Sequence, residues 1–159
     1  MKVSELTSTD NYFEDFVVGD VIRHARGKTV TEMDGVLLCN LVMNTAQGHF
    51  NSHLMQASPF GGVIVFGGIV ASMVIGLAYQ DTGEQALAEL ALDKVRFRVP
   101  VQHGDTLYAF TEVLDKQDAD RDDAGEIRFK HRGFNQKDEL VFEGERRVLV
   151  KRRSHWADK

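Results

Sequence analysis

The segment VIVFGGIVASMVIGLAY, residues 63–79, is the longest apolar stretch of the chain and decides the fold. Its length is close to that of a short membrane span. However, it contains glycines and lies between polar loops, which favours a helix buried on nearly all sides within a soluble fold. We therefore predict one central helix over this segment.

Strand-like patterns follow the central helix as far as the end of the chain. Hydrophobic and polar residues alternate in four segments: LALDKVRFRVPV, TLYAFTEVLDKQ, EIRFKHRGFNQ and ELVFEGERRVLVKR. The stretches QHGDT and NQKDE are typical of tight turns, and QDADRDDAGE of a charged hairpin loop. The second half is thus predicted to be an antiparallel meander of at least four strands.

The region before the central helix predicts extended pieces and one short helix. FVVGDVIRHARGKTVT indicates an extended piece, a Gly-Asp turn and a second extended piece. Thr31 is a candidate N-cap for a helix with Asp34 in its first turn. The predicted fold class is therefore α+β, with an antiparallel sheet wrapped around one long central helix.

Composition restricts the classes of partner. The 159 residues suit a single domain over 1–159, and a net charge of −5 argues against nucleic acid or an anionic membrane as partner. Small molecules are the expected partners. Cys39 is the single cysteine and is expected to be a buried, inert thiol, and the N-terminal stretch lacks a signal-peptide pattern. The expected location is the cytoplasm.

Four blocks of sequence carry a family resemblance. FEDFVVGDVIRH, KTVTEMD, MNTAQGHFNSHLMQASPFGGVIVFGG and VRFRVPVQHGDTLYAFTEVL occur in the order and spacing of a MaoC-like acyl-CoA dehydratase with the hotdog fold. The similarity covers about residues 12–150. This family includes the (R)-specific enoyl-CoA hydratases, which are carbon-oxygen lyases. The resemblance implies a homodimer or higher homo-oligomer that binds acyl-CoA between subunits, and no cofactor beyond the coenzyme A of the substrate.

The resemblance also assigns site residues in the loop before the central helix. The family's catalytic His falls on His49, whereas its Asp five residues earlier falls on Asn44 and a later Asp falls on Asn51. Phe60 and Gly67 fall on the matching Phe and helix-start Gly, which fixes the register. The string MNTAQGHF resembles a branch of the family that carries Asn at position 44.

Hydration of an enoyl thioester requires a base for water and hydrogen-bond donors for the developing oxyanion. The expected catalytic residues are His49 as base, Asn44 as a water-orienting amide and Gly67 as a backbone donor at the helix start. The expected substrate-binding residues are Gly68, Phe60, Asn51 and His53.

Several residues have an alternative interpretation. His53 lies at helical spacing from His49, but no third ligand is near, so no metal site is predicted and His53 is expected to line the pocket or face solvent. Asp34 is interpreted as a helix-start residue, although it could replace the missing Asp. The alternating Lys94, Arg96 and Arg98 indicate either a solvated strand face or contacts with coenzyme A phosphates.

Three functions are compatible with these residues. The first is a hydratase or dehydratase for a short, branched or carboxylated enoyl-CoA; the second is an acyl-CoA thioesterase; the third is a nonenzymatic acyl-CoA binding protein. A thioesterase needs an acidic residue to activate water, which Asn44 does not supply. The acyl-chain length depends on where the fold places Met33, Met43, Met55 and Met73.

Overall fold

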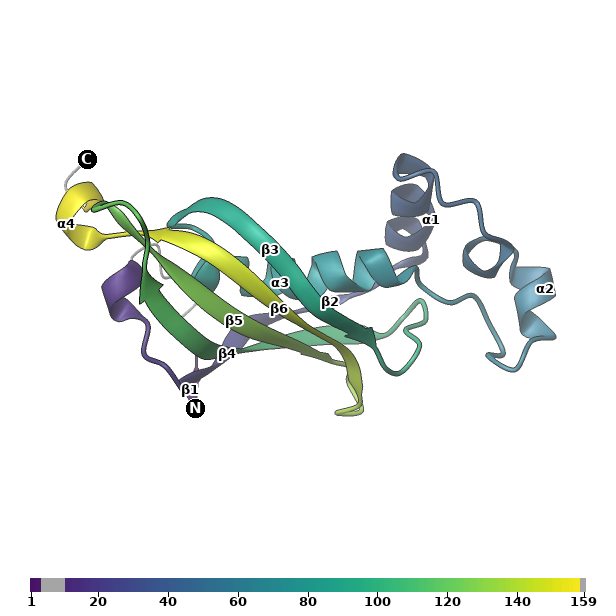
Figure 1. The fold of residues 1–159 in the computed structure, drawn as a ribbon. Coiled ribbons are helices and arrows are strands. Elements are labelled where there is room, and N and C mark those ends of the chain that lie inside the picture. Colours follow the sequence, from purple (N-terminus) through teal and green to yellow (C-terminus); the bar gives the residue numbers. More distant parts are fainter. Residues whose placement is uncertain (4–10, 158–159) are drawn as a thin grey trace.

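The computed structural model describes residues 1–3 and 11–157, and within them one curved sheet surrounds a long helix (Figure 1). The strands lie in the order β1-β2-β4-β5-β6-β3, with β1 parallel to β2 and the other pairs antiparallel. The predicted α+β class with a sheet around a central helix is confirmed. The strand bounds are β1 Lys2–Val3, β2 Val21–Thr29, β3 Ala86–Phe97, β4 Thr106–Asp118, β5 Ala124–Phe134 and β6 Leu140–Lys151.

The predicted four-strand meander is wrong in one connection. Strands β4, β5 and β6 are neighbours in chain order, but β3 pairs with β6 rather than with β4. Both sides of β4 are already occupied, by β2 and β5. The strand that follows the helix therefore joins the far edge of the sheet.

The central helix, α3, spans Gly67–Thr82 and so begins at the helix-start glycine that the resemblance assigned, four residues after the start of the apolar segment. Residues 63–66 are extended instead: Ile64 forms a bridge with Gln102, and the N–H of Val65 donates to the carbonyl of Val101 at 2.8 Å. Because the backbone groups of Ile64 and Val65 bond to partners outside the helix, these residues cannot belong to it.

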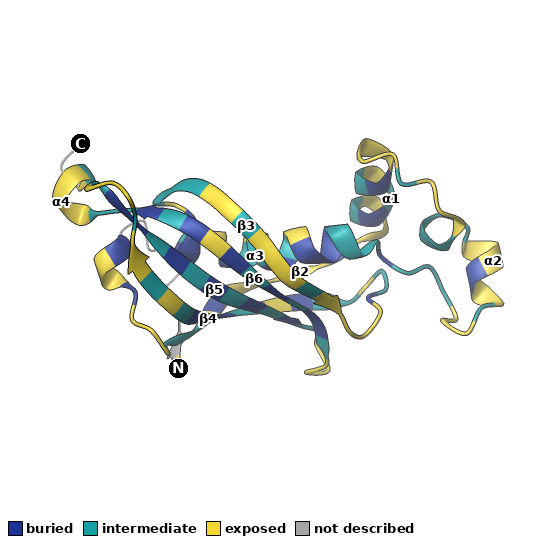
Figure 2. Ribbon diagram, in the orientation of Figure 1, coloured by how far each residue is buried: buried dark blue, intermediate teal, exposed yellow. Residues whose placement is uncertain are grey.

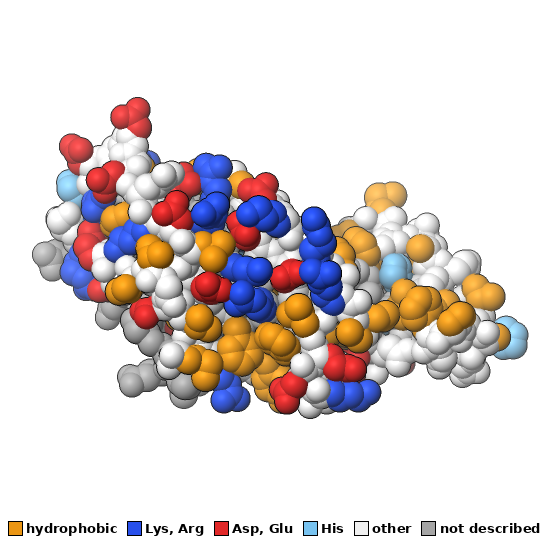
Figure 3. Space-filling model, turned by 60° about the horizontal axis from the view of Figure 1, so that its bottom comes forward, with side chains coloured by type: hydrophobic (Ala, Val, Ile, Leu, Met, Phe, Trp, Pro, Cys, Tyr) orange, Lys and Arg blue, Asp and Glu red, His pale blue; other side chains and the backbone are white. Residues whose placement is uncertain are grey.

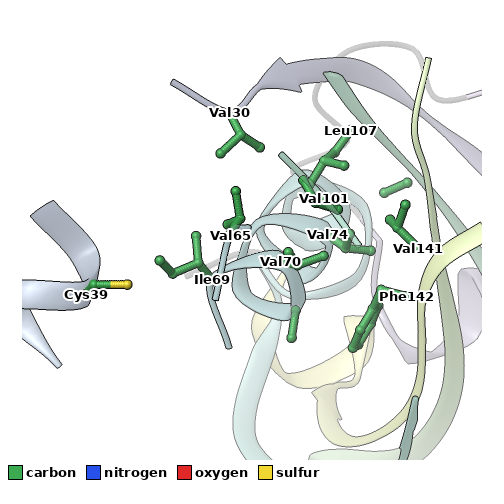
Figure 4. Packing of buried hydrophobic residues seen from close by; sticks show 12 residues of the cluster. Val30, Cys39, Val65, Ile69, Val70, Val74, Val101, Leu107, Val141 and Phe142 are labelled. Carbon is green, nitrogen blue, oxygen red and sulfur yellow. The ribbon is translucent and has the colours of Figure 1, made fainter. Parts of the chain in front are cut away.

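The helix is also less enclosed than predicted. Figure 4 shows Val70 and Val74 directed into the cluster formed with Leu107 and Phe142. Ser72, Gly76 and Tyr79 on the opposite face are exposed. One face of α3 is therefore buried by the sheet and the other is open in the single chain. Among the described residues, none of the helices is long and apolar enough to cross a membrane.

A projecting arm, residues 31–66, extends beyond one end of the sheet (Figure 1). It contains α1 (Glu32–Leu41), the 3-10 turn η2 (Gln47–His49) and α2 (Ser52–Gln56). As predicted, Thr31 caps α1, its Oγ accepting from the N–H of Asp34 at 3.1 Å. Much of the arm is exposed (Figure 2). At the opposite end lie η1 (Phe13–Asp15) and α4 (Arg153–Trp156); residues 16–18, predicted to be extended, belong to no strand.

A buried polar layer separates two hydrophobic clusters beneath the sheet. Along β4, Ala109 belongs to the cluster around the start of α3, Val113 belongs to the cluster at the other end, and Thr111 lies between them. The layer takes one residue from each of five elements: His24 of β2, Asp81 of α3, Thr111 of β4, His131 of β5 and Arg146 of β6.

Hydrogen bonds connect four of the five members of this layer. His24 Nδ1 lies 2.6 Å from Asp81 Oδ2, His24 Nε2 lies 2.7 Å from Thr111 Oγ1, and Thr111 Oγ1 lies 2.8 Å from His131 Nδ1. One proton assignment satisfies all three pairs: Nδ1 of each histidine donates, and the Thr111 hydroxyl donates to His24. Arg146 Nη2 donates to the carbonyl of Thr82 at 2.8 Å. The layer thus ties the C-terminal end of α3 to the sheet.

The layer predicts an acid-sensitive contribution to stability. Burial, with the charge of Arg146, holds the pKa of His131 well below its usual 6.5. The unfolded chain therefore binds the proton more readily, so stability is complete above about pH 6.5 and falls as the pH drops. Between about pH 7.5 and pH 5.5 we expect His131 to account for a loss on the order of 1 kcal/mol.

Urea unfolding of the protein and of His131→Gln at both pH values tests this, because the glutamine does not titrate. The variant should lose less stability between the two pH values than the wild type. Equal losses in the two proteins would contradict a neutral, buried His131.

Candidate functional site

A largely apolar cavity of about 330 Å³ opens beside the start of α3, where the arm meets the end of β3. It brings together three of the predicted site residues, His49, Phe60 and Gly67. The cavity is lined by His49, Phe60, Ile64, Val65, Phe66, Gly67, Val70, Phe97, Arg98, Val99, Pro100, Val101 and Val141.

A backbone contact orients the imidazole of His49. Its Nδ1 lies 2.7 Å from the carbonyl oxygen of Ile64, and its ring packs against Phe66 with centroids 5.7 Å apart. A carbonyl only accepts, so Nδ1 carries the proton and donates it. In the neutral ring, Nε2 then holds a lone pair. His49 is therefore arranged to act as a base through Nε2.

The start of α3 supplies the polar backbone of the cavity. Gly67 and Gly68 occupy the first turn, whose N–H groups have no acceptor within a helix. The positive end of the helix dipole favours negative charge at this place. A Cβ on Gly67 would lie 3.0 Å from the ring of Phe97, so a glycine lets the backbone approach the cavity wall closely. Gly67 lines the cavity, whereas Gly68 does not.

The other residues assigned by the resemblance lie outside the cavity lining. Asn44 Oδ1 accepts from the N–H of Ala46 at 3.2 Å, and Asn51 caps α2 by accepting from the N–H of Leu54 at 3.0 Å. His53, on α2, is exposed. Asn44 and Asn51 therefore stabilise local turns that shape the loop carrying His49.

The alternative acid, Asp34, also lies outside the cavity lining. Hydrogen bonds from Lys28 and from Thr31 lower the pKa of Asp34 to about 2, so the carboxylate is ionised at neutral pH. Its contacts with Thr31 form a capping box at the start of α1, which agrees with the interpretation of Asp34 as a helix-start residue. The four methionines named above line no part of this cavity: Met33 and Met43 are exposed, Met55 is buried in the arm, and Met73 lies along α3.

Three features of the site were not recognised in the sequence: the carbonyl of Ile64, the ring of Phe97 and the position of Arg98 at the cavity. The first arises because residues 63–66 pair with the 101–102 segment instead of entering the helix. The ring of Phe97 and the position of Arg98 could have been predicted, because the alternation of residues 95–99 places both residues at the end of a strand. Among the described residues there is no cluster of His, Cys, Asp and Glu suited to a metal ion.

Comparison with known proteins identifies the family. The sequence profile of mesaconyl-CoA hydratase matches residues 4–152, which is most of the chain. The chain belongs to the mesaconyl-CoA hydratase family. It is 35% identical over 155 residues to a mesaconyl-CoA hydratase from Haloarcula marismortui, covering 89% of this chain and 42% of that protein. This mesaconyl-CoA hydratase family member thus spans less than half the length of that relative.

Solved structures show the same fold as this mesaconyl-CoA hydratase family member. A Chloroflexus aurantiacus structure described as a MaoC domain dehydratase superposes with a TM-score of 0.85 at 29% identity, covering 91% of this chain and 45% of that one. A Mycobacterium tuberculosis protein with a double hotdog fold superposes with a TM-score of 0.83 at 25% identity, covering 93% and 46%. The expected MaoC-like hotdog fold is confirmed.

The contact with Ile64 predicts the tautomer of His49. In the protein labelled with ¹⁵N at histidine, above the pH range in which free histidine titrates, we expect the proton on Nδ1 and none on Nε2. The His49→Gln variant assigns the signal, and exposed His155 serves as a histidine without this constraint. A proton found on Nε2 would contradict a base at that atom.

Proposed function

We propose that the protein hydrates a short, carboxylated enoyl-CoA such as mesaconyl-CoA, or catalyses the reverse dehydration. The single observation that carries this is the cavity that both His49 and Gly67 line, in a chain of this family. A base and an oxyanion donor are the two groups that the addition of water to an enoyl thioester requires. The reaction needs no cofactor besides the coenzyme A of the substrate.

In the proposed reaction, His49 is the only side chain that takes and gives a proton. Nε2 takes a proton from water as the water oxygen bonds to the β-carbon. The electrons of the double bond move toward the thioester, whose oxygen accepts from the first-turn N–H of Gly67. The proton then passes from His49 to the α-carbon. Asn44 acts by shaping the turn through Ala46, and it donates no proton.

We also propose that the active form is a homodimer. Exposed apolar side chains lie on β3, including Leu90, Leu92 and Phe97. More hydrophobic side chains lie along the projecting arm (Figure 3). Strand β3 is an edge of the sheet and offers unpaired backbone groups. The double hotdog fold of the Mycobacterium tuberculosis protein supports the pairing of two hotdog units. The proposed location is the cytoplasm, which suits the free thiol of Cys39.

The function is tested with mesaconyl-CoA and the His49→Ala variant. Loss of the enoyl-thioester absorbance should accompany wild-type turnover, and the variant should be slower by roughly 10²- to 10⁴-fold, the scale of a general base. His155→Ala is the matched control, because His155 is exposed on α4 at the other end of the molecule.

A second readout separates the alternative functions. Release of free thiol without loss of the double bond would identify a thioesterase. Binding of mesaconyl-CoA without either change would identify an acyl-CoA binding protein. A His49→Ala variant with wild-type turnover would remove His49 from the reaction.

A homodimer should have twice the mass of a single chain in solution. Sedimentation equilibrium should give about double the 17.9 kDa of one copy. A Leu92→Arg substitution adds a charge to the exposed apolar face of β3 and should shift the protein toward single copies, because an unpaired charge is costly in an apolar interface. A mass of one chain for the wild type at all concentrations would contradict the dimer.

A further inference from the structure

The cavity combines an apolar wall with one permanent charge. Among the described residues that line it, Arg98 alone is charged at every accessible pH, and its neighbours include Phe97, Val99 and Pro100. Arg98 is thus the one fixed cation among the described residues that line the cavity together with His49.

Glu143, a residue outside the cavity lining, binds the guanidinium of Arg98. Its Nε donates to Glu143 Oε1 at 3.0 Å, and its Nη2 donates to the same oxygen, so both bonds use one edge of the guanidinium. Glu143 has a second cation, since Lys130 Nζ lies 3.3 Å from its Oε2. Arg98 can therefore engage another carboxylate while Glu143 stays neutralised.

The surroundings of Arg98 have a surplus of positive charge. Beside the cavity, a surface groove carries four basic side chains and two acidic ones. Figure 3 shows basic and acidic side chains interleaved over the sheet. Arg98 lines both the groove and the cavity. The charged residues of the groove are Lys94, Arg96, Arg98, Lys130, Glu143 and Glu145.

We propose that Arg98 binds the free carboxylate of a dicarboxylic acyl thioester and so determines the specificity of the site, which rests on the hydratase function proposed above. Mesaconyl is methylfumaryl, a short acyl group with a carboxylate at the end opposite the thioester. Moving such a carboxylate into an apolar cavity costs several kcal/mol unless a cation meets it. The planar guanidinium of arginine matches a carboxylate with paired hydrogen bonds.

The phosphates of coenzyme A are a second source of the same anionic chemistry. Every acyl-CoA substrate carries these phosphates, whereas only a dicarboxylic acyl-CoA carries a free carboxylate. Crotonyl-CoA has the thioester and the double bond but no free carboxylate on its acyl group. Comparing mesaconyl-CoA with crotonyl-CoA therefore separates the two sources.

The test measures kcat/KM for both substrates in the wild type, Arg98→Met and Arg98→Lys. Arg98→Met should lower kcat/KM for mesaconyl-CoA by roughly 10- to 100-fold, the scale of hydrogen bonds to a charged group, and should change crotonyl-CoA by less than about 3-fold. Arg98→Lys keeps the charge and should recover part of the loss. Arg96→Met is the matched control: Arg96 lines the groove but not the cavity, so the ratio of the two substrates should stay at the wild-type value.

Each other outcome has a definite meaning, provided thermal unfolding shows the variants folded. Equal losses for both substrates in Arg98→Met, with weaker inhibition by free coenzyme A, would assign Arg98 to the phosphates and overturn the proposal. Unchanged kinetics would leave Arg98 as a partner of Glu143 only and would also overturn it. A wild-type protein that hydrates crotonyl-CoA but not mesaconyl-CoA would refute the carboxylate specificity, and one that hydrates neither would refute the proposed function as well.

Discussion

Burial of one face of α3 in the concave side of the sheet is the constraint on which the rest of the molecule depends. The contact is so close that a Cβ on Gly133 of β5 would lie 2.4 Å from a methyl group of Val74. Only glycine at that position lets the helix reach the sheet without displacing Val74. Because the helix is fixed in this way, its first turn always faces the same place, which is the cavity beside Phe97.

The two ends of α3 differ in their hydrogen-bond partners. At the C-terminal end, Arg146 donates to the carbonyl of Thr82, and His24 bonds to Asp81. A cation next to the negative end of a helix is electrostatically favourable, so this end is anchored. At the N-terminal end, the backbone N–H groups of the first turn have no such partner within the helix. Anchoring one end leaves the other able to meet a developing negative charge.

The arm brings the base to this helix end through one backbone contact. Short polar contacts, such as the cap of α2 by Asn51, define the shape of the arm locally. They do not by themselves place His49 near Gly67. The extended residues 63–66 do so, because Val65 bonds to Val101 while the carbonyl of Ile64 accepts from His49. The same four residues therefore position the base and lead the chain into the helix.

The sequence by itself determined the main elements and the family, because periodicity and turn residues are local properties. The alternation of β4, β5 and β6, the Thr31 cap and the motif around His49 needed no distant contact to be recognised. The single domain over residues 1–159 stays a prediction from length, and the roles of the site residues stay predictions from the resemblance. Only the tertiary structure showed that β3 joins β6, that residues 63–66 pair with the 101–102 segment, and that Arg98 reaches the cavity. Each of these depends on which backbone groups find partners far away along the chain, and a local pattern does not contain that information.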